Sequence, residues 1–315
     1  MIDPYLTQGN SLRRLLGRMN REANAAGVPP RRIHLVVAID RLLARLLVSA
    51  PRDSWVVKGG FANQIRRPAE ARFTEDIDLR IASKIDAAPS LIAEAFGTDL
   101  ADLLSYELAS PPAPLEGPPG GGLRFAAVAR IVGNELVRFK IDMSASDVVV
   151  GDLERHLSDP VLAAIGYPRS EFLVYPVAQS IAEKIHALTL PRDHENSRVR
   201  DLVDLVWFAE RFSVRSSDLI EAAVATFAVR DDHPWPPSLP SLPESWAKPW
   251  ARFRTAIGLE PATTKEAIVF LSSFFAPVFA GSRQLLWEPE TAEWVGVDTE
   301  WVAVPAVDDS PVKSQ

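Results

Sequence analysis

The sequence predicts an α+β fold, with a small mixed or antiparallel sheet flanked by helices and then a mostly helical part. Short apolar or alternating runs, which are typical of strands, all fall before residue 150. Beyond that point apolar side chains recur at helical spacing. We therefore expect two domains, one over residues 1–150 and one over residues 151–315.

Two helical regions are predicted in the first domain. Within residues 10–49 apolar side chains recur every three or four positions, with Asp40, Arg41 and Arg45 between them, which is the pattern of an amphipathic helix. The other helical region is expected over residues 86–105.

Four strands are predicted in the same domain, over residues 55–58, 73–81, 123–132 and 136–146. Gly59-Gly60 ends the first strand, and a short helix then runs as far as Pro68. Gly133-Asn134 is a typical hairpin turn between the last two strands. Residues 110–122 are rich in proline and glycine, so we expect them to form a flexible loop.

The second domain is expected to contain helices over residues 176–190, 199–212, 216–228, 246–257 and 264–280. Its proline-rich segment, residues 231–246, reads as a connector. The tail beyond about residue 303 is expected to fray.

Composition narrows the class of protein. The 315 residues are 47% hydrophobic and 24% charged, as in ordinary globular proteins. The absence of cysteine rules out disulfides, thiolate zinc sites and cysteine nucleophiles, and is compatible with a cytoplasmic location. With a net charge of -7, binding to a polyanion would need a local basic patch. We expect neither a signal peptide nor a membrane-spanning segment.

A pair of carboxylates, Asp76 and Asp78, lies on the polar face of a predicted strand. Residues i and i+2 of a strand share a face, so the two carboxylates converge. Like charges that close are unfavourable unless they are protonated or bridged by a cation, and Mg²⁺ or Mn²⁺ prefers such oxygen ligands. A bare Asp-x-Asp is more often a solvated strand face, so its context decides the interpretation.

That context favours a metal site. The Gly59-Gly60 turn allows backbone N–H groups to approach an anion, and a helix start there adds a favourable dipole. Asp142 lies on the polar face of a strand that can pair beside Asp76 and Asp78, and three carboxylates can hold two metal ions. Taken singly, a diglycine is more often a plain turn and Asp142 has even odds of being a strand-edge charge.

In combination the motifs resemble those of the polymerase-β-type nucleotidyltransferase superfamily: K-G-G, then R-x-T-x-D-I-D-L, then K-I-D-M. More narrowly, the chain is similar to the AbiEii/AbiGii (MenT-like) family of abortive-infection and type IV toxin–antitoxin toxins. The narrower similarity covers about residues 30–285. It rests on A-E-K-I-H-A-L at 182–188, S-R-V-R-D-L-V-D-L at 197–205 and W-A-K-P-W-A-R-F at 246–253.

The resemblance implies a polymerase-β-like first domain and a set of site residues. Its catalytic residues are Asp76, Asp78, Asp142, Lys184 and Asp201, of which the first three bind metal, and its nucleotide-binding residues are Gly59, Gly60, Arg72, Thr74 and Lys184. Lys184 is expected to neutralise charge on the triphosphate. Asp204 lies one turn from Asp201 on the same helix face, as an alternative functional acid or as structural support.

The function implied is that of a Mg²⁺- or Mn²⁺-dependent nucleotidyltransferase toxin. It would transfer nucleotides from an NTP to an RNA 3′ end, with the tRNA acceptor stem as the first candidate, and so inhibit translation and growth. An antitoxin from a neighbouring gene is the expected partner. Two alternatives stay open: transfer of a nucleotidyl or phosphoryl group to a protein or small-molecule hydroxyl, and an inactive scaffold, against which the intact acid set argues.

A local basic rim for RNA is a further hypothesis, with an ordinary scatter of arginines as its alternative. The candidate residues lie in the segments that carry the acids: Arg66, Arg67, Arg72, Arg124, Arg130, Arg138 and Lys140.

Overall fold

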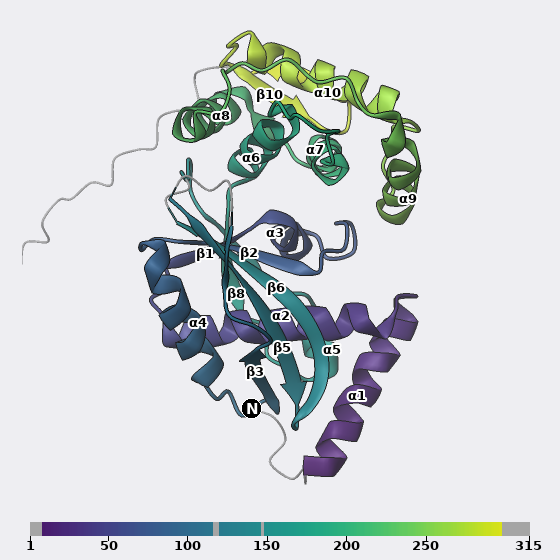
Figure 1. The fold of residues 1–315 in the computed structure, drawn as a ribbon. Coiled ribbons are helices and arrows are strands. Elements are labelled where there is room, and N and C mark those ends of the chain that lie inside the picture. The colour runs from purple at the N-terminus through teal and green to yellow at the C-terminus, as the bar shows by residue number, and fades with distance from the viewer. Residues whose placement is uncertain (1–7, 116–119, 146–147, 298–315) are drawn as a thin grey trace, which may run out of the picture.

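A mixed β-sheet forms the lower body of the molecule, and a cluster of helices forms the upper one (Figure 1). The computed structural model describes residues 8–115, 120–145 and 148–297. The sheet strands are β1 (Trp55–Lys58), β2 (Asp76–Ile81), β3 (Leu104–Leu108), β4 (Ala113–Leu115), β5 (Gly122–Ile131), β6 (Asn134–Ala145), β7 (Glu154–Leu157) and β8 (Glu171–Val174). Their order is β3-β5-β6-β2-β1-β8-β7, with β4 paired to β5.

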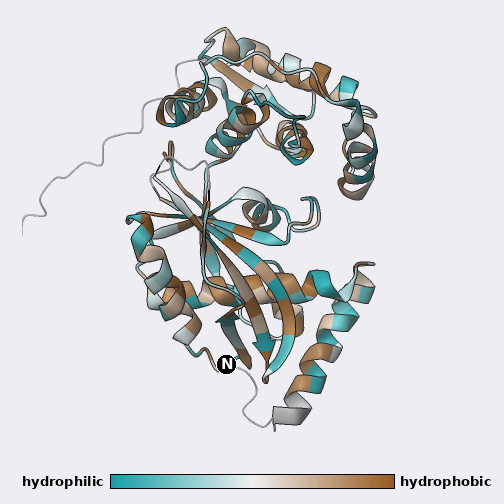
Figure 2. Ribbon diagram, in the orientation of Figure 1, coloured by the Kyte–Doolittle hydropathy of each residue, from teal (hydrophilic) through white to brown (hydrophobic). Residues whose placement is uncertain are grey.

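The helices of the lower body are α1 (Gln8–Ala25), α2 (Pro30–Ser49), α3 (Gly59–Arg66), α4 (Ala88–Gly97) and α5 (Val161–Ile165), with a 3₁₀ turn at Ile85–Ala87. The long helix α2 crosses one face of the sheet and packs against β6 and α4 (Figure 1). It is buried over most of its length because the sheet lies on one side of it and other helices lie on the other. The hydropathy colouring shows the apolar residues of this body gathered on the sheet and α2 (Figure 2).

The charged residues of α2 lie inside the protein. Arg41 and Arg45 are both buried, and both bind the buried carboxylate of Asp102. Arg41 Nε donates to Asp102 Oδ2 at 2.9 Å, and Arg45 Nη2 donates to Asp102 Oδ1 at 2.7 Å. A buried charge needs a partner with good hydrogen-bond geometry, and Asp102 supplies one for both guanidinium groups.

The upper body contains α6 (Val177–Thr189), α7 (Val199–Arg211), α8 (Ser216–Arg230), α9 (Ala247–Ile257) and α10 (Thr264–Phe279), with a 3₁₀ turn at Glu244–Trp246. It also holds a three-stranded sheet of β9 (Val214–Arg215), β10 (Leu285–Glu288) and β11 (Glu293–Gly296). Trp207, Trp250 and Trp287 are buried in its core, as expected of packing residues. None of the described helices combines the length and the apolar composition needed to cross a bilayer.

The predicted α+β architecture is confirmed, and so are the β5–β6 hairpin and the five helices of the second half. The region over residues 10–49 is two helices, because the chain turns at Gly27 (φ 63°) before α2 begins at Pro30. The helix predicted over residues 86–105 ends at Gly97, and the residues from Leu104 onward form β3 against β5.

Several elements were not predicted. The expected flexible loop contains β4, although its residues 116–119 lie outside the described part, as does the tail beyond residue 303. Strands β7 to β11, which all lie after residue 150, were missed, and β8 joins the sheet through β1. The hydrophobic core of the lower body therefore extends to Val174. A division after residue 150 stays a prediction, and the packing favours a later one, just before α6.

Candidate active site

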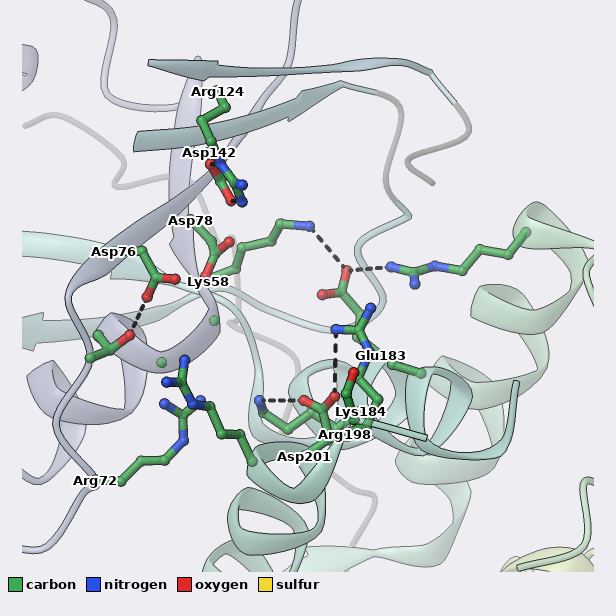
Figure 3. A pocket seen from close by; sticks show the side chains of 17 residues that line it. Lys58, Arg72, Asp76, Asp78, Arg124, Asp142, Glu183, Lys184, Arg198 and Asp201 are labelled. Atoms are coloured by element: carbon green, nitrogen blue, oxygen red, sulfur yellow. Dashed lines mark hydrogen bonds and ion pairs between the residues drawn. The ribbon is translucent and has the colours of Figure 1, made fainter. Parts of the chain in front are cut away.

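A pocket of about 570 Å³ lies where the upper body meets the sheet, between β2, β5 and β6 on one side and α6 and α7 on the other (Figure 3). All the residues to which the resemblance gave a role line it: Gly59, Gly60, Arg72, Thr74, Asp76, Asp78, Asp142, Lys184 and Asp201. The structure thus brings together residues that are far apart in the sequence. Their individual roles remain proposals.

A row of four charged residues crosses the sheet at this pocket. Lys58 pairs with Asp78 between antiparallel β1 and β2, and Asp78 pairs with Asp142 between parallel β2 and β6. Asp142 in turn pairs with Arg124 of β5. Directly paired residues of neighbouring strands point to the same face, with their Cβ atoms about 5 Å apart. Two acids therefore lie side by side in the middle of the row, with a cation at each end.

Positive charge compensates the two central acids, Asp78 and Asp142, to different extents. Burial, followed by the nearby carboxylates of Asp76 and Asp142, raises the pKa of Asp78 to about 7, although Lys58 opposes the shift. Asp142 is neutralised by Arg124, whose Nε and Nη2 donate to its two oxygens at 2.7 and 2.6 Å. Asp78 is thus the carboxylate that most needs an additional positive charge.

The donor chemistry suits a divalent cation. Asp76, Asp78 and Asp142 supply the hard oxygen ligands that Mg²⁺ or Mn²⁺ prefers, and a cation would offset the charge at Asp78. In the described part of the chain, no three acidic or histidine side chains are placed closely enough to hold an ion. Asp142 engages Arg124 instead, and Asp76 accepts a hydrogen bond from the hydroxyl of Thr74. A metal ion at these residues would therefore have to compete with Arg124 for Asp142.

The glycine turn is sterically required at this site. Helix α3 begins at Gly59, which has φ 66°, so its first-turn N–H groups lie at the pocket. A Cβ added to Gly59 would overlap Oδ2 of Asp78. A Cβ on Gly60 would lie 3.1 Å from the side chain of Thr74. Only glycine therefore allows the backbone to pass this close to the acids.

The opposite wall of the pocket is built on Asp204. This buried carboxylate accepts hydrogen bonds from Arg72 Nε at 2.8 Å, Arg72 Nη2 at 2.9 Å and Lys184 Nζ at 2.5 Å. Lys184 also lies 3.5 Å from Asp201 Oδ1. Burial by itself would lower the pKa of Lys184, but Asp204 and Asp201 outweigh it and raise the value, so the ammonium stays charged.

The two acids of α7 have different positions. Asp201 lines the pocket and keeps 15% of its side-chain surface exposed, whereas Asp204 is 2% exposed and does not line it. Arg72 lowers the pKa of Asp204 more than Lys184 does, and together they overcome the opposing effect of burial. Asp204 therefore anchors two cations, and Asp201 is the one of the two acids that faces the pocket.

Sequence reasoning missed several pocket residues. Lys58 was read only as the residue before the diglycine, yet its ammonium lies 3.5 Å from Oε1 of Glu183. Arg230, at the end of α8, lies 3.6 Å from the same oxygen. Glu183 had a signal, since it precedes Lys184 on α6, whereas nothing local pointed to Arg230. The other lining residues, Ala187, Ser197, Arg198 and Arg200, stand in the quoted motifs but were given no role in the site.

Part of the basic rim hypothesis does not match the geometry. Arg72 and Arg124 line the pocket, but four of the candidates are paired elsewhere and lie outside its lining. These are Arg66, which is buried and binds Glu154, Arg67, which binds Glu70, Arg130, which binds Glu107, and Arg138, which binds Glu135. The acidic partners of these residues lie elsewhere in the chain. The sequence alone therefore did not distinguish the paired basic residues from those that line the pocket.

A strand carrying paired aspartates, a diglycine helix start beside it and a lysine across the pocket suit a site that handles phosphate groups. The family model described as "Nucleotidyl transferase AbiEii toxin, Type IV TA system" matches residues 41–273. The chain belongs to this family. It is therefore a nucleotidyltransferase toxin of the type IV toxin–antitoxin class, with a nucleoside triphosphate as its donor and an antitoxin as its partner.

Among solved structures, the chain is similar to "MenT4, nucleotidyltransferase toxin Rv2826c from Mycobacterium tuberculosis H37Rv". The two share 18% identity and a TM-score of 0.48, over 88% of this chain and 99% of the other. No curated protein sequence matches the chain.

The close approach at Gly59 predicts that Gly59→Ala abolishes nucleotidyl transfer. The added methyl group must displace Asp78, in addition to the cost of a positive φ. Gly27→Ala is the matched control, because Gly27 has φ 63° with no atom near its would-be Cβ. The control should lose only about 1–2 kcal/mol of unfolding free energy and keep its activity. Equal activity of the two variants, measured at equal folded fraction, would contradict the prediction.

The raised pKa of Asp78 predicts a pH-dependent stability. Between its usual pKa of 3.8 and about 7, the folded protein binds a proton that the unfolded chain has released. The folded state is therefore increasingly penalised as pH rises through this window. In EDTA, Asp78→Asn should be as stable as the parent near pH 4 and more stable at pH 8, by urea denaturation. The exposed Asp53→Asn should show no such trend.

The positions of the two α7 acids predict different defects. Asp204→Ala leaves Arg72 and Lys184 buried without their partner, which should cost about 3–5 kcal/mol of unfolding free energy. Asp201→Ala should leave stability within about 1 kcal/mol of the parent and lower kcat for nucleotidyl transfer. The assignment is wrong if Asp201→Ala keeps full activity, or if Asp204→Ala unfolds at the parental urea concentration.

Proposed function

We propose that this toxin transfers nucleotides from an NTP to the 3′ hydroxyl of an RNA, with the tRNA acceptor end as the first candidate. By blocking that end it would inhibit translation and growth, acting in the cytoplasm. The observation that carries the proposal is the in-register pair of Asp78 and Asp142 beside the Gly59-Gly60 turn.

In this proposal each side of the pocket has its own task. Asp76, Asp78 and Asp142 would hold a divalent cation, Mg²⁺ or Mn²⁺, which when bound would offset negative charge on the triphosphate. The N–H groups at Gly59-Gly60 face the phosphates at the start of α3. Lys184 supplies a fixed positive charge for the leaving group.

The proposed reaction is a displacement at the α-phosphorus of the NTP. The acceptor hydroxyl oxygen bonds to that phosphorus, the bond to the bridging oxygen breaks, and pyrophosphate leaves. In this proposal Asp142 exchanges Arg124 for the cation and, from the strand next to Asp78, accepts the hydroxyl proton. Asp201 is proposed to orient Lys184, 3.5 Å away, from the pocket side.

Charge supports an anionic substrate. The chain has a net charge of -7, yet seven basic side chains line this one pocket: Lys58, Arg72, Arg124, Lys184, Arg198, Arg200 and Arg230. Five carboxylates line the same pocket, Asp76, Asp78, Asp142, Glu183 and Asp201, so the lining keeps a net excess of about two positive charges, which favours an anionic substrate.

The decisive experiment supplies the purified protein with labelled NTPs, Mg²⁺ and total RNA. Label should enter RNA, should be lost with EDTA and with Asp76→Asn, and should persist with the exposed control Asp53→Asn. Loss of the 3′ label on periodate pretreatment of the RNA would assign the acceptor to its 3′ end. Transfer of label to protein or to a small molecule, with none to RNA, would favour the alternative acceptors.

A further inference from the structure

A second hollow adjoins the active-site pocket on the same face of the sheet. It has a volume of about 500 Å³ and shares Thr74, Asp76 and Arg200 with the lining of the pocket. Because the shared residues include the first carboxylate of β2, a molecule lying in this groove would end at the catalytic acids.

Small residues make the groove. One row along β6 from the Asp78–Asp142 pair, Asp76 pairs with Lys140, and Lys140 pairs with Ala126 of β5. Ala109, whose N–H donates to the carbonyl of Ala126 at 2.8 Å, also lines the groove. The small side chains of Ala109 and Ala126 thus leave the groove open, whereas longer side chains at these positions would fill it. The groove runs along β6 away from the acids.

The walls of the groove are cationic. Four basic residues line it against two acids: Arg31, Arg138, Lys140 and Arg200. Arg31 pairs with Glu75, and Arg138 pairs with Glu135. Within residues 8–115, 120–145 and 148–297, the exposed side chains of Lys140 and Arg200 form no hydrogen bond or ion pair. Exposed cations without partners, next to a site that handles phosphates, suit further phosphate groups.

Phe73 adds an apolar surface to one wall. Its ring is partly exposed, and the guanidinium of Arg32 lies 5.1 Å from the ring centroid. Single-stranded nucleic acids are bound by this combination of a basic track for the backbone and an aromatic surface for the bases. A duplex would instead be recognised across a wide, shallow groove of the nucleic acid by a broad protein surface.

We propose that this groove binds the backbone of the acceptor RNA as a single strand, over the nucleotides immediately before the reacting 3′ hydroxyl. The inference rests on the proposed function and names where its acceptor lies. Lys140 and Arg138 contact successive phosphates along β6, and Arg200 lies at the junction with the pocket. The terminal hydroxyl then reaches the acids from the side of Asp76.

The test is the double variant Arg138→Gln/Lys140→Gln, assayed with a labelled NTP and a single-stranded RNA acceptor. The KM for RNA should rise about tenfold, while the KM for NTP stays unchanged, because neither residue lines the NTP pocket. The dependence of log KM on log salt should become shallower by about 1.4, or about 0.7 for each lost phosphate contact. Lys140→Gln alone should give half that change in slope.

The matched control is Arg52→Gln/Arg155→Gln, which removes two equally exposed arginines that line neither hollow. Equal melting temperatures of both double variants and the parent establish that the fold is retained. If the groove and control variants have the same KM for RNA and the same salt slope, the inference is overturned and the proposed function stands. If the parent labels no RNA at all, the proposed function fails, and this inference fails with it.

Discussion

The parallel pairing of β2 with β6 sets Asp78 directly beside Asp142, and the surrounding structure compensates for that placement. Two adjacent carboxylates repel one another, which is why the pKa of Asp78 is raised by its neighbours as well as by burial. Lys58 and Arg124, at the two ends of the same row, balance the pair from outside. Adjacent carboxylates of this kind destabilise the folded protein. Enzyme sites commonly contain such groups where a bound substrate or cofactor supplies the opposite charge.

The second constraint is the join between the two bodies. Asp204, on α7 of the upper body, binds Arg72 from the segment that leads into β2, and also Lys184 on α6. Charge-assisted bidentate bonds of this kind define an orientation as well as an attraction. Since the carboxylate is buried, it cannot exchange these partners for water at low cost. The pocket between sheet and helices is thereby held at one width, and Lys184 faces the acids across it.

The same arrangement gives an acidic chain a local site for an anionic substrate such as a nucleoside triphosphate. Basic residues are gathered around the pocket and the adjoining groove, together with the carboxylates that line them. Local field, and not net charge, determines attraction over such distances, because salt screens contributions from beyond about 10 Å. A net charge of -7 is therefore no obstacle to an anionic substrate.

The sequence by itself determined the local features: strand β1, the diglycine stop, the common face of Asp76 and Asp78, and the β5–β6 hairpin. These follow from the two-residue period of a strand and from turn chemistry, which act within a few residues. Its motifs also identified the family and part of the pocket lining.

Only the tertiary structure decided which residues face each other across the fold. The register of β2 against β6, the burial of Arg41 and Arg45 on Asp102, and the different positions of Asp201 and Asp204 all depend on segments that are distant in the chain. A helical pattern shows which residues are polar, but it does not show whether a polar residue faces solvent or a buried partner from another segment. The same limit applied to Glu183 and Arg230, because an ion pair between two helices leaves no periodic trace in either one.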